Sequence, residues 1–237
     1  MRRMLLSVTA VCFVAGFITT PVASAQQSVN LWVGGFAPIG LESRDINDVL
    51  VQNRNVFIYN FGRLTGPTFG GDYVVALGEY FEAGAGLGYY QQSTPAIDCC
   101  FTDQNRLDVA ANFKLRVVPF TATFRAVAFG HNAPVQPYIG GGIGVFGWRY
   151  SEIGDFVLAT TPPTISRGEV NTLSGAAVGP VVLAGVRFPI GPTAPGFEVR
   201  WQHAHGQLGN PGPGHDFAGS VIDLSGFNYL FTFNIRF

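Results

Sequence analysis

Hydrophobic and polar residues alternate along much of this chain, most regularly near its C-terminal end. One side of an extended strand there carries Tyr229, Phe231, Phe233, Ile235 and Phe237. The other side carries Asn228, Thr232, Asn234 and Arg236, with Leu230 as the one apolar exception. A period of two is typical of a strand whose two faces meet different environments. An apolar face toward lipid and a polar face toward a lumen is the pattern of a transmembrane β-barrel strand.

Alternation and turn residues together predict eight strands. We expect them at residues 28–38, 68–78, 80–92, 113–129, 135–150, 176–190, 196–205 and 222–237. Pro119 lies within the fourth of these segments, where it predicts a bulge or irregularity because proline cannot donate to a sheet ladder. Lys114 and Arg116 share one face of that segment and Arg125 lies on the other, so a bulge would leave their orientations open.

The connections between these segments are alternately long and short. Long ones follow the first, third, fifth and seventh segments, whereas residues 78–79, 130–134 and 191–195 form the short ones. Extended outer loops and tight periplasmic turns give an antiparallel barrel this spacing. The sequence therefore predicts an all-β fold, an eight-stranded antiparallel up-and-down transmembrane β-barrel. The first long loop contains residues 46–51, which suit either a short helix or a strand extension.

The composition agrees with a chain that spreads its apolar residues over many strands. Charged residues make up 12% of it, whereas soluble domains average roughly 25%. Beyond residue 25 the chain has no uninterrupted apolar run long enough for a spanning helix. The net charge is −1, so we expect no nucleic-acid partner. Lys114 is the one lysine among 14 basic residues, and arginine suits fixed, forked ion pairs.

The first 25 residues have the layout of a secretory signal peptide. Arg2 and Arg3 precede an apolar run at residues 5–18, and Ala23-Ser24-Ala25 offers small residues for cleavage. The run is shorter than the roughly 20 residues that a membrane-spanning helix needs. We therefore expect residues 1–25 to be removed and residues 26–237 to form a single outer-membrane β-barrel domain.

These features together resemble the small outer-membrane β-barrel-domain proteins, the OmpA/OmpX/OmpW-like group. The resemblance covers residues 26–237 and rests on pattern, not on a catalytic motif. It implies a bacterial outer-membrane location, contact with outer-membrane lipid and a monomer. The final strand resembles the aromatic signal by which the barrel-assembly machinery recognises such proteins, which would be formed by Tyr229, Phe231, Phe233, Ile235 and Phe237. No peptidoglycan-binding domain follows the strands, so a cell-wall tether is not implied.

Strand parity places several charged residues on the inner face of the barrel. The expected lumen residues are Asp72, Glu82, Arg187, Glu198, Arg200 and Arg236. Eight strands leave an interior just wide enough for side chains to fill, and buried charges must be paired or they cost several kcal/mol each. We therefore predict an ion-pair and hydrogen-bond network inside the barrel, with a catalytic or ligand-binding carboxylate pair as the competing interpretation. Gly84, Gly86 and Gly88 share one face, which leaves room for large lumen side chains.

Other residue clusters offer little specific chemistry. Residues 140–144 are glycine-rich but lack the lysine of a phosphate-binding loop and the spacing of a dinucleotide fingerprint. His203 and His205 lie on one face with His215 nearby, but no third metal ligand adjoins them in sequence. We expect these histidines to lie at the membrane interface next to Trp201, and we predict no metal and no cofactor.

Cys99 and Cys100 are adjacent in a long loop, and no other cysteine remains once the signal peptide is removed. Unpaired thiols rarely persist in an oxidising compartment. A vicinal disulfide, intermolecular pairing and a free pair all fit the sequence.

The sequence favours a structural or surface-interaction role and a lumen filled by side chains. Limited passage of small solutes is compatible with this interpretation. We expect no enzymatic activity. One alternative is an outer-membrane enzyme acting on lipid, which needs a serine near a histidine. Another is a soluble, lipocalin-like barrel that binds a hydrophobic ligand, which would bury Phe231, Phe233 and Phe237.

Overall fold

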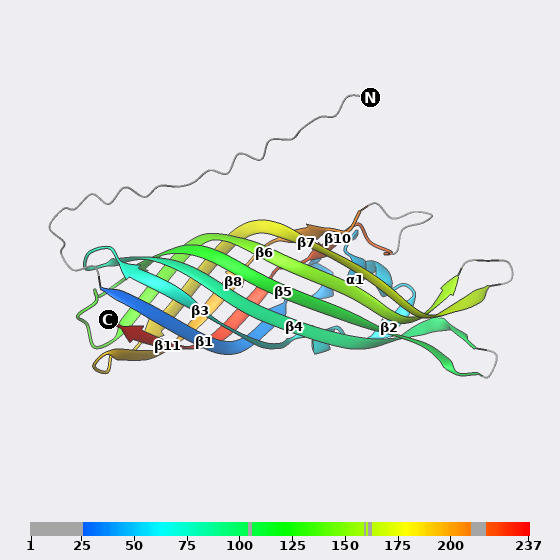
Figure 1. Ribbon diagram of the computed structural model, residues 1–237, viewed down its shortest axis with the longest axis horizontal. Coiled ribbons are helices and arrows are strands. Elements are labelled where there is room, and N and C mark those ends of the chain that lie inside the picture. Colours follow the sequence, from blue (N-terminus) through cyan, green and yellow to red (C-terminus); the bar gives the residue numbers. More distant parts are fainter. Residues whose placement is uncertain (1–25, 104–105, 159, 161–162, 210–216) are drawn as a thin grey trace, which may run out of the picture.

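The computed structural model describes residues 26–103, 106–158, 160, 163–209 and 217–237, so the expected signal peptide at residues 1–25 lies outside the described residues. The described chain is dominated by long antiparallel strands that wrap into a barrel (Figure 1). The barrel strands are β1 (Gln27–Pro38), β3 (Gly66–Ala76), β4 (Phe81–Thr102), β5 (Asp108–Val127), β6 (Gln136–Leu158), β7 (Thr164–Arg187), β8 (Thr193–Gln202) and β11 (Gly226–Arg236).

Each barrel strand pairs with its neighbours along the chain, and the first and last strands close the ring. β1 pairs with β11 from Ser28 opposite Arg236 to Pro38 opposite Gly226, and on its other side β1 pairs with β3. All of these pairings are antiparallel. The predicted eight-stranded up-and-down barrel is confirmed. The C-terminus lies at the same end of the barrel as the start of β1 (Figure 1).

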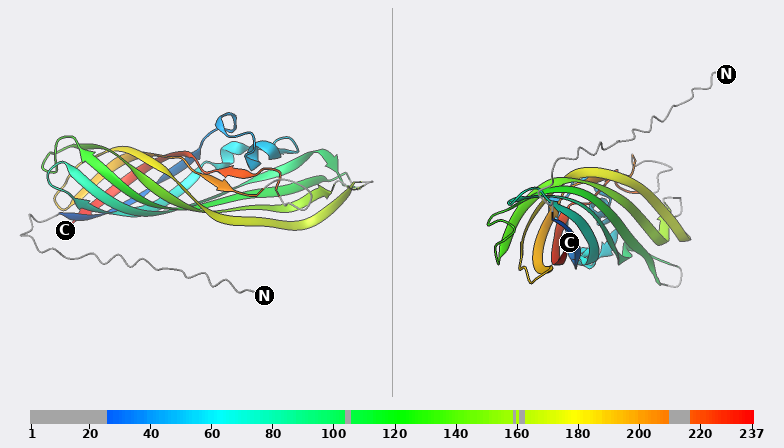
Figure 2. Two further views of the ribbon diagram at one scale, coloured as in Figure 1. Left: turned by 90° about the horizontal axis from the view of Figure 1, so that it is seen from above. Right: turned by 60° about the vertical axis from the view of Figure 1, so that its left-hand side comes forward.

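The barrel strands fall into two length classes. β1, β3, β8 and β11 have between 10 and 12 residues, whereas β4, β5, β6 and β7 have between 20 and 24. The four long strands continue past the rest of the barrel as a projecting sheet, which we call the outer extension (Figures 1 and 2).

The extension corrects the predicted connections, because much of the chain that we expected to be long loop after the third and fifth segments is strand. Outside a bilayer neither face of a strand has to be apolar. The alternation of apolar and polar residues is therefore less regular in the outer extension, although the hydrogen-bonded pairing of β4 with β5 and of β6 with β7 continues there.

The irregularity predicted at Pro119 is also wrong. Leu87 pairs with Phe120 and Tyr90 pairs with Val117, so the register is the same on both sides of the proline. Pro119 itself stands opposite Phe146 in an unbroken β5–β6 ladder. The parity of β5 is therefore continuous.

The connections at the outer end contain short elements. The first holds η1 (Leu41–Ser43), α1 (Val49–Asn53), β2 (Phe57–Tyr59) and η2 (Phe61–Leu64). β2 pairs with the outer part of β4. The predicted strand at 222–237 is divided into β10 (Val221–Asp223), which pairs with β9 (His205–Gln207), and β11. None of the helices in the described chain has the length and apolar character needed to cross a membrane.

Candidate functional site in the barrel interior

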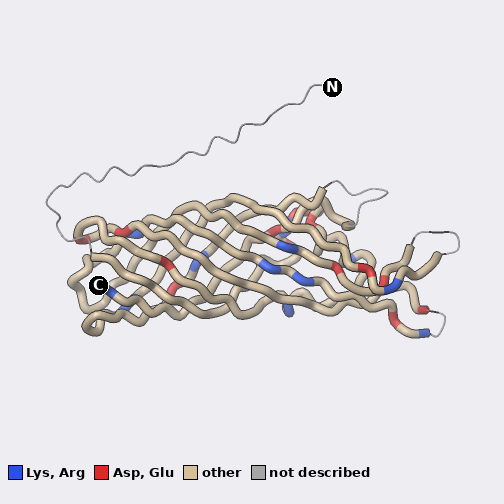
Figure 3. Tube along the Cα trace, in the orientation of Figure 1, with Lys and Arg blue, Asp and Glu red and all other residues tan. Residues whose placement is uncertain are grey.

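Six charged side chains lie inside the barrel near the end where β1 begins and β11 ends. They come from five strands and comprise Asp72, Glu82, Arg125, Arg187, Glu198 and Arg200, which we call the ionic layer. All six are buried. Three are cations and three are anions, so their formal charges cancel. In Figure 3 acidic and basic positions lie close together in this part of the barrel, and most of the surrounding trace is uncharged.

Asp72 joins two arginines from distant parts of the wall. Its Oδ2 accepts hydrogen bonds from Arg125 Nη2 at 2.9 Å and from Arg200 Nη2 at 3.0 Å, and Asn30 Nδ2 donates to the same oxygen at 3.2 Å. β3 and β8 are separated by β1 and β11 in the ring. The contact between Asp72 and Arg200 therefore crosses the interior of the barrel.

Glu198 completes the central group. Arg200 donates to Glu198 Oε1 from Nε at 2.9 Å and from Nη2 at 2.6 Å. The other oxygen of Glu198 accepts from the Tyr138 hydroxyl at 3.0 Å and lies 3.6 Å from Arg125 Nη2. The Tyr138 ring also lies 5.5 Å from the Arg125 guanidinium carbon, within cation–π range.

A second group lies closer to the mouth. Arg187 on β7 binds both oxygens of Glu82 on β4, and His131 Nε2 lies 2.9 Å from Glu82 Oε1. Because β5 and β6 separate these strands in the ring, this ion pair also crosses the interior. Gln136 Oε1 accepts from Arg187 Nε at 2.8 Å and from Arg236 Nη2 at 2.7 Å.

The structure thus brings together five of the six residues that parity placed in the lumen. The arrangement of Arg236 differs from the prediction, because its contact is the Gln136 amide and no carboxylate of the described chain lies within ion-pair distance. It stands at the last position of β11, at the mouth, where it is only partly buried. Sequence reasoning missed Arg125, Tyr138, His131 and Gln136. Unbroken parity through Pro119 would have placed Arg125 inside.

Glycines on β4 make room for two of the lumen side chains. A Cβ at Gly86 would collide with the Asp72 carboxylate, and one at Gly88 would collide with the Trp32 ring. Trp32 in turn lies under Arg200, with the guanidinium carbon 5.4 Å from the ring centroid. Gly86 and Gly88 therefore leave room for large lumen side chains, as the sequence predicted.

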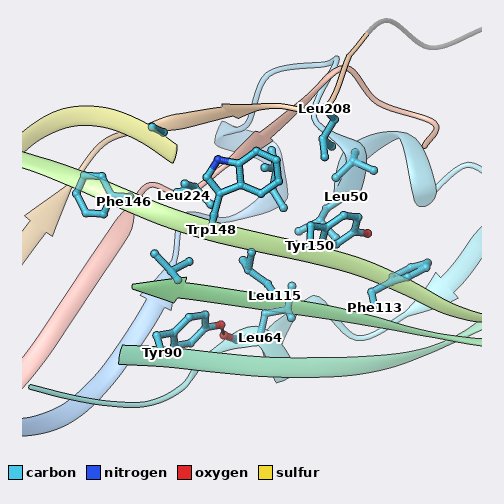
Figure 4. Packing of buried hydrophobic residues seen from close by; sticks show 14 of the residues in the cluster. Leu50, Leu64, Tyr90, Phe113, Leu115, Phe146, Trp148, Tyr150, Leu208 and Leu224 are labelled. Carbon is cyan, nitrogen blue, oxygen red and sulfur yellow. Dashed lines mark hydrogen bonds between the residues drawn. The ribbon is translucent and has the colours of Figure 1, made fainter. Parts of the chain in front are cut away.

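The outer half of the interior is filled mainly by apolar side chains (Figure 4). Glu152 is a charged residue buried beside them, where its Oε1 accepts from the Tyr150 hydroxyl at 2.9 Å and from Asn53 Nδ2 at 2.6 Å. Its largest buried members include Leu50, Leu64, Phe113, Leu115, Phe146, Trp148, Tyr150, Ile222 and Leu224, which we call the apolar cluster. Strands β5 and β6 supply one side of it, and α1 and β10 pack in from the connections. The cluster thereby attaches two outer connections to the barrel wall.

Asp48 fixes these two connections to each other. Its carboxylate caps α1 by accepting from the Leu50 amide at 2.8 Å, and it accepts from the Asp223 amide at 2.6 Å. Arg44 Nη1 donates to the same carboxylate at 3.0 Å. Burial raises the pKa of Asp48 from its ordinary value, although the Arg44 charge opposes the shift.

The outward face of the barrel is apolar and rich in aromatic side chains. On β11 the exposed residues are Phe227, Tyr229, Phe231, Phe233 and Ile235, and Phe231 is 60% exposed. Phe197 and Val199 on β8 continue this surface, and Phe197 packs on Phe231 with ring centroids 4.6 Å apart. The arrangement contradicts the soluble lipocalin-like alternative, which required Phe231, Phe233 and Phe237 to point inward.

A serine and a histidine do meet near the outer rim, but they are not arranged as a hydrolase triad. Ser225 Oγ lies 2.9 Å from His203 Nδ1, and the serine is buried. Asp223 approaches a different histidine, with its Oδ2 3.4 Å from His205 Nε2. In a serine hydrolase one histidine bridges the acid and an accessible serine. The first pair instead joins the residues between β8 and β9 to those between β10 and β11, and the second joins β9 to β10. His215 lies outside the described residues.

Cys99 and Cys100 form a vicinal disulfide in the outer extension. Of the three states that the sequence left open, the structure has this one. Asp98 lies next to the two sulfurs at a distance that suits a shared ion. Sulfurs joined to each other are not thiolates, however, and the thiolate is the form that binds metal.

No protein-family model matches the sequence, and no curated protein matches it significantly. Solved structures do match. The outer membrane protein OprG from Pseudomonas aeruginosa superposes with a TM-score of 0.52 at 10% identity, over 90% of this chain and 96% of that one. The chain has the fold of a small outer-membrane β-barrel. The resemblance stated from the sequence is confirmed at the level of the fold.

Two further structures match more distantly. The N-terminal β-barrel domain of Pseudomonas aeruginosa OprF has a TM-score of 0.43 at 8% identity, covering 90% of this chain and 98% of that one. Neisserial surface protein A has a TM-score of 0.42 at 13% identity, covering 90% of this chain and 97% of that one.

Proposed function

We propose that this chain is a monomeric protein of the bacterial outer membrane whose lumen is closed and whose outer extension serves a structural or surface-contact role. The observation that carries the closed lumen is the pair of cross-barrel contacts, Asp72 with Arg200 and Glu82 with Arg187. Paired buried charges hold their partners in place, because separating them would leave an uncompensated charge in a low-dielectric interior. The apolar cluster supports the same conclusion at the outer end of the interior.

Single-channel recording in planar bilayers tests the closed lumen. The wild-type barrel should give no large, steady pores, and liposomes containing it should not swell in small sugars. Replacing Glu82 and Arg187 by alanine removes one crossing pair and should raise the frequency of open events. The same paired replacement at Glu42 and Arg54, an exposed ion pair in the first connection, is the matched control. Large, steady wild-type pores would contradict the proposal.

The apolar outward face supports the membrane location. We expect the folded protein to partition into detergent, to migrate differently on a gel before and after heating, and to lack residues 1–25 when isolated from the outer membrane. N-terminal sequencing of that fraction should begin at Gln26. Recovery of the folded chain in a salt-washed soluble fraction would contradict the location.

We also propose that the aromatic face of β11 serves as the signal for the barrel-assembly machinery. Tyr229, Phe231, Phe233, Ile235 and Phe237 point away from the lumen, which leaves this face accessible to a partner before insertion. Phe237→Ala should lower the amount of folded protein in the outer membrane. Phe129→Ala is the matched control, because Phe129 is 67% exposed and Phe237 is 68% exposed but Phe129 lies in a turn. Equal loss in both variants would contradict the role.

A further inference from the structure

Three cations on the outer wall of the barrel have no acidic partner among the described residues. Arg116 on β5 stands directly opposite Arg149 on β6, and Lys114 stands opposite Ser151 one alternation farther out. Within the described part of the chain, none of the three cations forms an ion pair. Like charges directly opposite each other on neighbouring strands are destabilising. This group therefore contrasts with the ionic layer, where every arginine contacts a carboxylate.

The three cations lie at the outer border of the apolar face. Toward the end of the barrel where β1 begins and β11 ends, the outward positions on β5 are Phe124, Ala122, Phe120 and Val118, and those on β6 are Ile139, Gly141, Ile143, Val145 and Gly147. From Ile139 to Arg149 the chain advances ten positions, which matches the roughly 9–11 residues of a strand that spans the hydrocarbon core. The cations thus stand where lipid headgroups would begin. Figure 3 shows basic positions gathered on this part of β5 and β6.

Polar residues on the adjoining strands extend the group into a shallow groove. Gln91 on β4 pairs in register with Arg116, and Thr172 on β7 pairs with Ser151. The groove has a volume of about 270 Å³ and is lined by Gln91, Lys114, Arg116, Arg149, Ser151, Ile153, Val170 and Thr172. Two guanidinium forks and one ammonium suit the oxygen atoms of a phosphate group. Thr172 Oγ1 donates to Ser151 Oγ at 2.8 Å, which leaves the hydrogen of the Ser151 hydroxyl for a further acceptor. The lining has no carboxylate that would repel one.

We propose that Lys114, Arg116 and Arg149 bind the phosphate of an anionic lipid headgroup in the outer leaflet. Apolar residues flank the cations on both sides, with Val118 toward the membrane and Ile153 and Val170 in the groove itself. A ligand that carries both phosphate and acyl chains fits this order of surfaces better than free phosphate does. The inference rests on the proposed membrane location, because a lipid reaches this groove only if the barrel is inserted.

The test compares binding of one lipid to matched variants of the full chain. The probe is lipid A, a glycolipid with two phosphate groups, titrated into the folded barrel in neutral detergent micelles. The double variant Arg116→Gln/Arg149→Gln should weaken the apparent affinity by about tenfold or more, since a hydrogen bond to a charged group contributes about one decade of affinity. Arg54→Gln/Arg63→Gln removes the same charge from the exposed first connection and should change it by less than about twofold.

A conservative variant and two further probes complete the experiment. Arg116→Lys/Arg149→Lys keeps the charge without the fork and should bind with intermediate affinity. Lipid A lacking one phosphate should bind more weakly, and inorganic phosphate should not displace the lipid at equal concentration. Unchanged affinity in the glutamine variant, or displacement by inorganic phosphate as effective as by lipid, would overturn the proposal.

Insertion into neutral phosphatidylcholine vesicles is measured in parallel. A barrel that inserts but does not prefer lipid A contradicts the phosphate site alone. A barrel that fails to insert contradicts the proposed membrane location. The two inferences therefore fail in different ways.

Discussion

The two halves of the barrel interior are held together by different forces. Near the end where β1 begins and β11 ends, the ionic layer joins strands across the lumen through charged hydrogen bonds such as that of Asp72 with Arg200. Toward the outer end, the apolar cluster packs α1 and β10 against β5 and β6. Charged contacts depend on specific partners, whereas apolar contacts depend on filled volume. Damage to the two halves should therefore have different signatures.

The largest expected effect comes from removing one partner in the ionic layer. Arg125→Met leaves Asp72 and Glu198 to share Arg200, so the folded barrel should lose about 3–5 kcal/mol of its free energy of unfolding. Urea unfolding in lipid vesicles, followed by tryptophan fluorescence, measures this loss. Arg125→Met/Glu198→Gln restores equal numbers of cations and anions and should recover part of it. A double variant less stable than the single one would contradict the partner-dependent account.

A smaller and more local effect is expected in the apolar cluster. Leu50→Ala removes a fully buried side chain from α1, which should cost about 2–4 kcal/mol. Because α1 belongs to a connection and not to the wall, the cost should appear as faster hydrogen exchange in α1 and β10 while the barrel amides stay protected. Ile46→Ala is the control, since Ile46 is 73% exposed and Leu50 is 0% exposed. Equally faster exchange of the barrel amides would show that the two halves unfold as one cooperative unit, which would contradict the prediction.

Asp48 should give the attachment of α1 a dependence on pH. Burial raises the pKa of its carboxyl above the ordinary 3.8 in the folded protein. The folded state then binds the proton more tightly than the unfolded chain. The contribution of Asp48 to stability is therefore fully present below the ordinary pKa and is lost as the pH rises through the raised value.

Asp48→Asn should remove this slope while keeping the helix cap, because asparagine caps as well as aspartate does. Exchange rates of the Leu50 and Gln52 amides, corrected for intrinsic pH dependence, measure the change. An unaltered slope in the variant would assign the effect to another group.

The smallest effect is expected from the disulfide in the outer extension. Cys99 and Cys100 are adjacent, so their bond closes no loop of chain and restricts the unfolded state little. Cys99→Ser/Cys100→Ser should change the free energy of unfolding by less than about 0.5 kcal/mol. Intact-mass measurement of the non-reduced wild-type monomer should show the loss of two hydrogens. Absence of that loss would exclude the vicinal bond in solution.

How far the sequence predicts this molecule depends on where each residue lies relative to the bilayer. Phe231 and Glu198 could be placed on opposite faces because lipid and lumen impose a period of two. The outer extension was not predicted because its residues do not keep this regular alternation of apolar and polar side chains. The orientation of Arg125 could not be predicted because Pro119 suggested a bulge. In the structure the register is unbroken on both sides of that proline. The apolar cluster was not predicted either, since contacts such as that of Leu50 with distant strands have no local signal.

The unequal strand lengths make the molecule a closed ring over part of its length and an open sheet beyond it. A closed barrel has no strand edges, but a sheet that continues past the ring acquires two. β2 covers part of one edge through its pairing with β4 at Ile97. On the other edge, the β7–β8 ladder ends where Val181 meets Gln202, and in the described strands no ladder continues along β7 beyond it. Just beyond that point the Pro180 carbonyl still accepts from the His203 amide at 3.2 Å. Farther out, the edge of β7 has no strand partner among the described residues, and natural proteins keep edges of this kind from pairing with other chains.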